Sequence, residues 1–270
     1  MNYFNNKTIW ITGASSGIGK ALTIQLSKLG AKLIITARRK EELEKVKAEC
    51  GNADVHVHPY DLSDLDNLDD FSRIVQSEVG NIDILINNAG ISAWSSINGT
   101  QFKVYKDVMN LDFLSVVKLT QSVLPNMILR KKGQIVTNTS LLGKFAIKKR
   151  SAYASAKHAV HGFMDALRAE VYEYNIKVNT VAPGFVDTEV GMKALTEDGT
   201  PYGANDRGHE SQGMQVEKAA DMIIQAIKQN KRETYIVPAF GFPKVVLFLS
   251  RFMPGLAAII ARNYNEENNK

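Results

Sequence analysis

The sequence predicts an α/β fold in which a doubly wound parallel sheet of about seven strands carries helices on both faces. Short apolar runs alternate with longer amphipathic segments along the 270 residues, which is typical of strands alternating with helices. No internal repeat, low-complexity tract or linker rich in Pro, Gly or Ser divides the sequence. Such strands are joined by right-handed crossovers, so we expect them to lie parallel in one sheet.

The first strand and helix show this pattern most clearly. Residues 8–12 (TIWIT) are predicted to form a buried strand, and in the next segment Ile18, Leu22, Leu26 and Leu29 recur at helical spacing before the helix-ending Gly30. The further strands are predicted at residues 32–36, 55–57, 82–86, 134–138, 177–182 and 235–237. The further helices are predicted at 40–50, 102–129, 151–174 and 216–229, with one more from a cap at Ser63 or Asp64 to about Val79.

Composition excludes several classes of protein. With 44% hydrophobic and 23% charged residues, the chain can bury a sizeable core, which excludes disorder. A disulfide scaffold is excluded because Cys50 is the only cysteine, and its place before Gly51 predicts a helix end rather than a nucleophile. The polar segment Met1–Lys7 lacks the apolar core of a signal peptide. We therefore expect a cytoplasmic protein.

The net charge of +5 permits a polyanionic partner without requiring one. The basic residues are scattered, and their two short clusters are not interleaved with aromatic residues, so we expect no nucleic-acid partner. A small phosphorylated cofactor remains open. The pairs His56/His58 and His158/His161 have no carboxylate or cysteine that completes a ligand set, so we expect no metal.

The loop between the first strand and the first helix has the sequence TGASSGIG. Glycines let such a loop approach a pyrophosphate, whose charge meets the free N–H groups of the helix N-terminus. The spacing G-x-x-x-G-x-G differs from the usual G-x-G-x-x-G and would also fit a purely structural turn. The strand–turn–helix context favours dinucleotide binding, for which we predict the residues Gly13, Ser15, Ser16, Gly17, Ile18 and Gly19.

The second predicted strand ends at Ala37-Arg38-Arg39. Dinucleotide-binding folds that select NAD carry an acid near this point, to hold the ribose hydroxyls. An exposed helix start would explain the arginines only in part, because cations at a helix N-terminus oppose the macrodipole. A 2′-phosphate would pair with Arg38 or Arg39. The sequence therefore predicts NADP(H) in preference to NAD(H).

Tyr153 and Lys157 lie four residues apart on a predicted helix, so their side chains point the same way. A free phenol ionises near pH 10 and is a poor acid–base group at neutral pH. A neighbouring ammonium stabilises the phenolate, so the pair can transfer a proton. Alone, the pair would equally fit a surface Tyr and Lys on an amphipathic helix.

Further motifs follow the predicted strands, at the edge where doubly wound sheets bind ligands. Asn87-Asn88-Ala89-Gly90 follows the fourth strand, Ser140 the fifth, and Pro183-Gly184 the sixth, with Thr188 shortly after. Together with the glycine loop and Tyr-x-x-x-Lys, these motifs have the order and spacing of the short-chain dehydrogenase/reductase family. The sequence resembles that family, in its NADP-preferring type, over nearly its whole length.

The resemblance implies a role for each matching residue. Tyr153 would be the catalytic acid–base, Lys157 would bind the nicotinamide ribose beside it, Ser140 would bind the substrate oxygen, and Asn110 would hold a water of the proton relay. Ser140, Leu142 and Tyr153 would contact the substrate. Asp61 and Leu62 resemble adenine contacts, and Val186 and Thr188 resemble contacts of the nicotinamide carboxamide. The cofactor-binding residues after the glycine loop would be Arg38, Arg39, Asp61, Leu62, Asn88, Ala89, Gly90, Tyr153, Lys157, Pro183, Gly184, Val186 and Thr188.

The resemblance also implies a Rossmann-like fold and an oxidoreductase that interconverts a carbonyl and an alcohol by hydride transfer, with the cofactor supplying the hydride chemistry. Apolar residues near the motifs favour an apolar ketone or alcohol; they are Ile91, Trp94, Leu141, Leu142 and Phe145. The alternative is a non-catalytic NADP-sensing protein. Such a protein would need the glycine loop but not Ser140, Tyr153 and Lys157 together.

Residues 1–240 are predicted to form one catalytic and cofactor-binding domain, with 189–213 as a substrate lid that is ordered when the pocket fills. Residues 241–270 form an apolar C-terminal extension. Its run 245–260 is shorter than the ~20 residues that span a bilayer, and we favour a cap over the substrate pocket or a subunit interface. The alternative is membrane-surface contact through 241–263, aided by Lys244, Arg251 and Arg262, for a reductase of a lipid-like substrate.

The residue pattern of the helix that carries Tyr153 also predicts that the protein self-associates. It has an apolar stripe that faces its own sheet, made of Val160, Met164, Leu167 and Val171. Small side chains elsewhere on the helix permit close approach of a second helix; they are Ala152, Ala154, Ala156, Ala159, Gly162 and Ala166. With the family resemblance, this predicts a homodimer or homotetramer.

Overall fold

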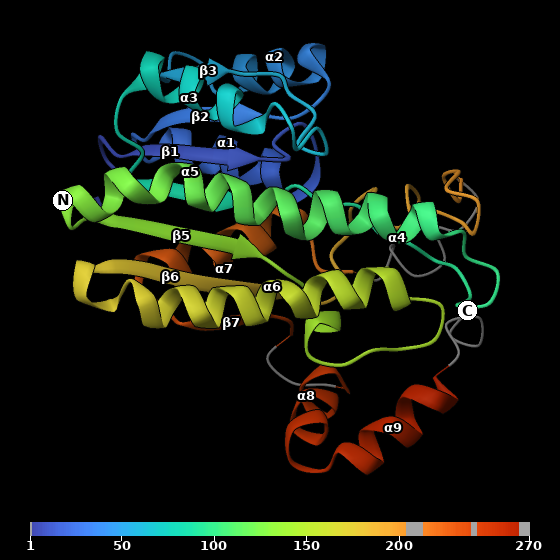
Figure 1. Ribbon diagram of the computed structural model, residues 1–270. Helices are drawn as coiled ribbons and strands as arrows, with labels where there is room; N and C mark the ends of the chain where they lie inside the picture. The colour runs from blue at the N-terminus through green and yellow to red at the C-terminus, as the bar shows by residue number, and fades with distance from the viewer. Residues whose placement is uncertain (1, 204–212, 239–241, 265–270) are drawn as a thin grey trace.

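A computed structural model describes residues 2–203, 213–238 and 242–264 of the chain. One parallel sheet has the strand order β3-β2-β1-β4-β5-β6-β7 and lies between two layers of helices (Figure 1). β1 pairs with β2 on one side and with β4 on the other, so the strand order reverses between β1 and β4. The predicted Rossmann-like, doubly wound fold is therefore confirmed.

The elements alternate along the chain as the sequence predicts. The strands are β1 (Thr8–Thr12), β2 (Lys32–Thr36), β3 (Val55–Val57), β4 (Ile84–Asn87), β5 (Gly133–Asn138), β6 (Ile176–Pro183) and β7 (Glu233–Ile236). The helices are α1 (Gly17–Lys28), α2 (Lys40–Glu49), α3 (Leu68–Val79), α4 (Phe102–Met109), α5 (Ser115–Arg130), α6 (Ser151–Glu170), α7 (Val216–Lys228), α8 (Phe242–Phe252) and α9 (Pro254–Asn263). Short turns are η1 (Asn110–Leu114), η2 (Leu141–Gly143) and η3 (Tyr172–Tyr174).

Two apolar cores lie on the two faces of the sheet, as expected for strands that helices cover on both sides. On one face Leu22 and Leu26 of α1 pack with Ile223 of α7. On the other, Val123 of α5 and Val160 of α6 pack with α3 residues. The central Trp10 is fully buried and donates its indole N–H to Thr36 Oγ1 at 2.9 Å, which satisfies its polar atom.

Three helix boundaries differ from the sequence prediction. The predicted helix 102–129 is interrupted by η1, a π-helical turn that places the Asp112 side chain in the interior. α3 begins at Leu68 rather than beside Ser63 or Asp64, because the Asp64 carboxylate accepts hydrogen bonds from the Asn67 side chain in a preceding turn. α6 ends at Glu170, and the rest of the predicted helix is the 3₁₀ turn η3.

The C-terminal apolar segment forms α8 and α9, which contact one another and lie outside the layered body (Figure 1). Val246 is buried, and Leu247 packs on a small core that contains Leu141 and Val237. An outer apolar face stays exposed; its residues are Val245, Phe248, Phe252, Met253, Leu256 and Ile259. Within the described residues, none of the helices has the length and apolar character needed to cross a membrane.

Candidate active site

The carboxyl ends of the strands open on a cleft of about 970 Å³. Its walls come from the loops after β1 to β6, from the start of α6, and from residues 188–202 above them. Every residue predicted to bind cofactor or substrate, or to be catalytic, lines this cleft except Gly19 and Asn110. The sheet therefore gathers motifs that are far apart in the sequence at one edge, where the strand order reverses.

The glycine loop requires its glycines for two different reasons. Gly13 and Gly17 have φ angles of +65° and +51°, which favour residues without a Cβ. Gly19 lies behind the loop rather than in the cleft. A Cβ on Gly19 would lie 2.2 Å from the backbone oxygen of Gly13, and one on Gly13 would lie 2.7 Å from Ala89 Cα. The loop is therefore packed against the Asn-Ala-Gly loop without room for side chains.

Asn88 connects the ends of three neighbouring strands. Its side-chain amide donates to the Thr12 carbonyl at 3.0 Å, and its side-chain oxygen accepts from Asn138 Nδ2 at 2.8 Å. The Thr12 hydroxyl oxygen also accepts the backbone N–H groups of Asn88 and Ala89, at 2.9 and 3.0 Å. The hydrogen bonds of the Asn88 side chain thus fix the cleft floor.

The far end of the cleft carries the arginine pair. Ala37, Arg38 and Arg39 line it after β2, and Arg39 is the N-cap residue of α2. Both arginine side chains are exposed, and Arg39 is near enough to Glu42 and Glu189 to contribute to the lowering of the pKa of each. The Asp61 carboxylate opposite them accepts the backbone N–H and the hydroxyl of Ser63, at 3.0 and 2.7 Å.

Ser140, Tyr153 and Lys157 all line the cleft. Ser140 Oγ accepts the backbone N–H of Leu142 at 3.1 Å, which leaves its hydroxyl proton available to an oxygen in the cleft. Lys157 is only 4% exposed, and its Nζ lies 5.4 Å from the centre of the Tyr153 ring. Tyr153 is therefore close enough to contribute to raising the pKa of Lys157.

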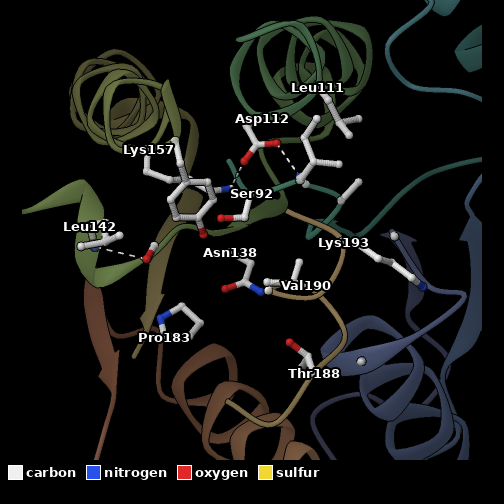
Figure 2. A pocket seen from close by; sticks show the side chains of 18 of the residues that line it. Ser92, Leu111, Asp112, Asn138, Leu142, Lys157, Pro183, Thr188, Val190 and Lys193 are labelled. Carbon is white, nitrogen blue, oxygen red and sulfur yellow. Dashed lines mark hydrogen bonds and ion pairs between the residues drawn. The ribbon is translucent and has the colours of Figure 1, made fainter. Parts of the chain in front are cut away.

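Asp112, which the sequence analysis did not single out, faces Lys157 in this cleft. Figure 2 shows the two side chains directed at each other, with Asp112 Oδ2 and Lys157 Nζ 3.0 Å apart. Asn110, predicted for this region, lies two residues earlier and does not line the cleft. An acidic residue inside the otherwise apolar segment NLDFL was the available signal.

Burial acts on both members of this ion pair. It raises the pKa of Asp112, while Lys157 acts in the opposite direction. For Lys157 burial lowers the pKa, but Asp112 and Tyr153 outweigh it, and the net direction is upward. For Asp112 the net direction is also upward, because burial outweighs the opposing effect of the Lys157 ammonium.

The other half of the cleft is mostly apolar. Trp94 stacks on Tyr202 with ring centres 5.7 Å apart, and the Arg150 guanidinium lies 4.4 Å from the Trp94 ring centre. The predicted lid contributes to this wall up to Tyr202, while its residues 204–212 lie outside the described part of the chain. The remaining apolar lining residues include Ile91, Leu142, Phe145, Ile147, Leu195, Pro243, Val246 and Ile260.

Within the described residues, the histidines have protein partners and do not line the cleft. His56 Nε2 pairs with Asp54 at 2.8 Å, and His158 Nδ1 lies 2.8 Å from the Ala154 carbonyl. Burial and the nearby Lys144 lower the pKa of His161 to about 4. In the described part of the chain, no three His, Cys, Asp or Glu side chains are grouped as metal ligands.

Residues 7–199 match the family model described as short chain dehydrogenase. Over 274 aligned positions the chain is 37% identical to the dehydrogenase/reductase SDR family protein 7-like of Anopheles gambiae, covering 99% of this chain and 86% of that protein. A short-chain dehydrogenase from Streptomyces avermitilis has the same fold, with a TM-score of 0.80 and 28% identity over 94% of each chain. Other solved structures of this fold are complexes with NAD in one case and NADP in another.

Gly19→Ala is expected to lower the melting temperature by several degrees, because the Gly13 oxygen that its Cβ meets belongs to the backbone and cannot move without distorting the loop. Gly255→Ala is the matched control, since that glycine is also helical and nothing lies within 4 Å of an added Cβ. Helix propensity then leaves its melting temperature equal or higher. Circular dichroism measures both, and equal values would contradict the tight packing of the loop.

Proposed function

The chain belongs to the short-chain dehydrogenase/reductase family, and from this premise we propose that it is an NADP(H)-dependent enzyme that interconverts an apolar ketone and its alcohol. Family membership makes it an oxidoreductase of CH–OH and C=O groups. The observation that supports the proposal most directly is that Ser140, Tyr153 and Lys157 line the same cleft as the glycine loop. A non-catalytic sensor of NADP has no use for these three side chains.

The cleft has a volume of about 970 Å³ and is lined by the glycine loop at one part and by Ser140, Tyr153 and Lys157 at another, which supports the binding of a dinucleotide. We assign its phosphates to the glycine loop, its adenine to Asp61 and Leu62, and its nicotinamide end to Val186, Thr188 and Lys157. Thr188 lies close to the glycine loop: a Cβ added to Gly17 would be 3.2 Å from Thr188 Cγ2. When bound, the cofactor supplies or accepts the hydride.

The protein's part in the reaction is proton transfer and placement. The Ser140 hydroxyl donates to the substrate oxygen, while Tyr153 gives the proton in carbonyl reduction and takes it in alcohol oxidation. The Lys157 ammonium stabilises the phenolate form of Tyr153. Apolar side chains that surround this point, among them Ile91, Leu142 and Phe145, favour an apolar substrate.

Tyr153→Phe is expected to keep the fold and cofactor binding but to lose most turnover, because Phe keeps the ring and removes the proton donor. Oxidation of NADPH with a panel of ketones, aldehydes and quinones identifies a substrate, on which the variant is then compared with the wild type. Cofactor affinity, measured by fluorescence titration, is the control. Rates near those of the wild type would refute the assigned mechanism.

Preference for NADP(H) is supported by Ala37, which places no carboxylate against a 2′-phosphate, and by the exposed Arg38 beside it. The planar guanidinium suits a phosphate. Loss of one such charged contact costs about 1.5–3 kcal/mol, or roughly ten- to hundredfold in affinity. Arg38→Ala should therefore raise the KM for NADPH by that factor and leave the KM for NADH nearly unchanged.

The matched variant for this test is Arg39→Ala, which removes the same charge one residue later. If Arg39→Ala raises the KM for NADPH and Arg38→Ala does not, the phosphate contact belongs to Arg39. Ala37→Asp should shift preference toward NADH, since its carboxylate would repel the phosphate and accept ribose hydroxyls. A wild-type enzyme with a kcat/KM for NADH equal to or above that for NADPH would overturn the proposed preference.

We further propose a homodimer or homotetramer. The apolar stripe of α6, with Val160 and Met164, packs on its own sheet. Ala152, Ala154 and Ala156, which the sequence analysis predicted for this contact, are instead buried within the protomer. The outer face exposes Ser155, Gly162 and Ala166, whose small side chains permit close contact with a second copy. Light scattering at micromolar concentration should give at least twice the 29.9 kDa chain mass, and Gly162→Trp should reduce it. A monomer mass for the wild type would contradict the proposal.

The outer apolar face of α8 and α9 supports a second role, contact with an anionic membrane surface. Phe248 and Phe252 are 57% and 64% exposed, and Arg251 and Arg262 are exposed beside them. Aromatic and basic residues on one surface are typical of monotopic attachment. The same two helices line the cleft through Val246 and Ile260, which would let a lipid-like substrate enter from the membrane side.

Phe248→Glu/Phe252→Glu should abolish co-sedimentation with vesicles that contain phosphatidylserine, while Val246 keeps the helix packed. Phe102→Glu is the control, because Phe102 is 73% exposed on α4. Wild-type binding should weaken at high salt. Wild-type protein that stays in the supernatant at low salt would remove the membrane proposal and leave α8 and α9 as a cap.

A further inference from the structure

We propose that Glu233 of β7 is a positioning residue for Ser140, and that it acts through Lys144. The inference rests on the substrate-binding role proposed for Ser140. Glu233 is not among the described residues that line the cleft, and it touches no reacting atom in this assignment. It acts on the turn that follows the serine, so its effect is separable from cofactor binding.

The Ser140 hydroxyl depends on the short turn η2. Ser140 is the N-cap residue of this turn, and its Oγ accepts the backbone N–H of Leu142, which is the dashed line at Leu142 in Figure 2. Lys144 is the C-cap residue, and its backbone N–H donates to the Leu141 carbonyl at 2.8 Å. Hydrogen-bond geometry is poor in a 3₁₀ turn. Contacts from outside the turn therefore decide how well the serine is held.

Glu233 holds the C-terminal end of η2. Lys144 Nζ and Glu233 Oε1 lie 2.6 Å apart, and only about a quarter of each side chain is exposed. The carboxylate is itself fixed, because its Oε2 accepts the Tyr235 hydroxyl at 3.0 Å and its Oε1 lies 3.4 Å from His161 Nδ1. β7 pairs with β6 in the sheet. One carboxylate thus connects η2 to the sheet and to α6.

The attraction between Glu233 and η2 comes from the Lys144 charge. Burial and the nearby Lys144 lower the pKa of His161 to about 4, so this histidine is neutral at pH 7. An ion pair that is partly buried is also screened less by salt than an exposed pair. Removal of the Lys144 charge therefore weakens the connection between the turn and β7.

A second contact of η2 is with α6, at Gly143. A Cβ on Gly143 would lie 2.6 Å from His161 Cδ2 and 2.9 Å from the Lys157 carbonyl oxygen. The φ angle of Gly143 is outside the left-handed region, so close packing on α6, rather than backbone conformation, excludes a side chain here. The turn that follows Ser140 is thus held by α6 at Gly143 and by β7 at Lys144.

The first test is hydrogen exchange of η2 in the protein without ligand. Lys144→Met keeps the length of the side chain and removes its charge, so the backbone N–H groups of residues 142–145 should exchange about three- to fivefold faster. Lys144→Arg keeps the charge and should restore the exchange of the wild type. Equal exchange in the wild type and Lys144→Met would overturn the proposal.

Lys118→Met is the matched control for the exchange measurement. Lys118 of α5 also pairs with a carboxylate on another helix, Asp69 of α3 at 2.8 Å, and its side chain is 28% exposed. The substitution removes a similar ion pair away from η2, so residues 142–145 should exchange as in the wild type. Faster exchange of these residues in Lys118→Met would show a general loss of stability and overturn the proposal.

The second test is a double-mutant cycle with Ser140→Ala on a confirmed ketone. Lys144→Met and Glu233→Gln should each lower kcat about three- to tenfold, because a displaced hydroxyl no longer meets the substrate oxygen. The dissociation constant of NADPH, measured by fluorescence titration, should stay as in the wild type. In the Ser140→Ala background neither change should lower the remaining rate further. Equal losses in both backgrounds, or weaker NADPH binding, would overturn the proposal.

The cycle also separates this inference from the proposed function. If Ser140→Ala turns over at the wild-type rate, the proposed role of Ser140 fails, and the positioning role fails with it. If Ser140→Ala is slow but Lys144→Met and Glu233→Gln turn over like the wild type, only the positioning role fails.

Discussion

The close approach of the β1 and β4 loops is the constraint on which the cleft depends. The strand order reverses at this point, and the Thr12 hydroxyl and the Asn88 side chain join the two strand ends. Gly13 then lies against Ala89 with no room for a Cβ. Because Thr12 and Asn88 find their hydrogen-bond partners within the protein, the ends of β1 and β4 are held in place beside the cleft. The motifs that follow the later strands lie around these two ends.

A second constraint is the burial of charge. An apolar fold stabilises Lys157 in its interior only with a counter-ion, and Asp112 supplies it from a different helix. The pair explains features that the glycine-loop geometry does not. These are the π-helical turn η1, which brings Asp112 inward, and the absence of a side chain at Gly90. The π-helical turn and the buried ion pair are thus parts of one arrangement.

The sequence predicts most of the fold because the strands are short apolar runs with local signals at their ends. Gly30 ends α1 as predicted, and its φ of +77° is the reason that glycine suits this place. Asp112 is not predictable in this way. Helical periodicity treats residues 102–129 as continuous, so it cannot indicate that a π-helical turn brings Asp112, rather than Asn110, to the cleft. The direction of that side chain depends on Lys157 and Ile91, which are distant in sequence.

The two ends of the cleft differ in chemistry, and this difference gives it a direction. Arg38 and Arg39 make one end cationic and open to solvent, whereas Trp94, Phe145 and Leu142 make the other end apolar. Helices α8 and α9 extend that apolar end, since Val246 and Ile260 line the cleft while Phe248 and Phe252 face outward. On the proposed function, an apolar substrate would lie at the apolar end beside Ser140 and Tyr153, and the dinucleotide would extend from the charged end to Lys157.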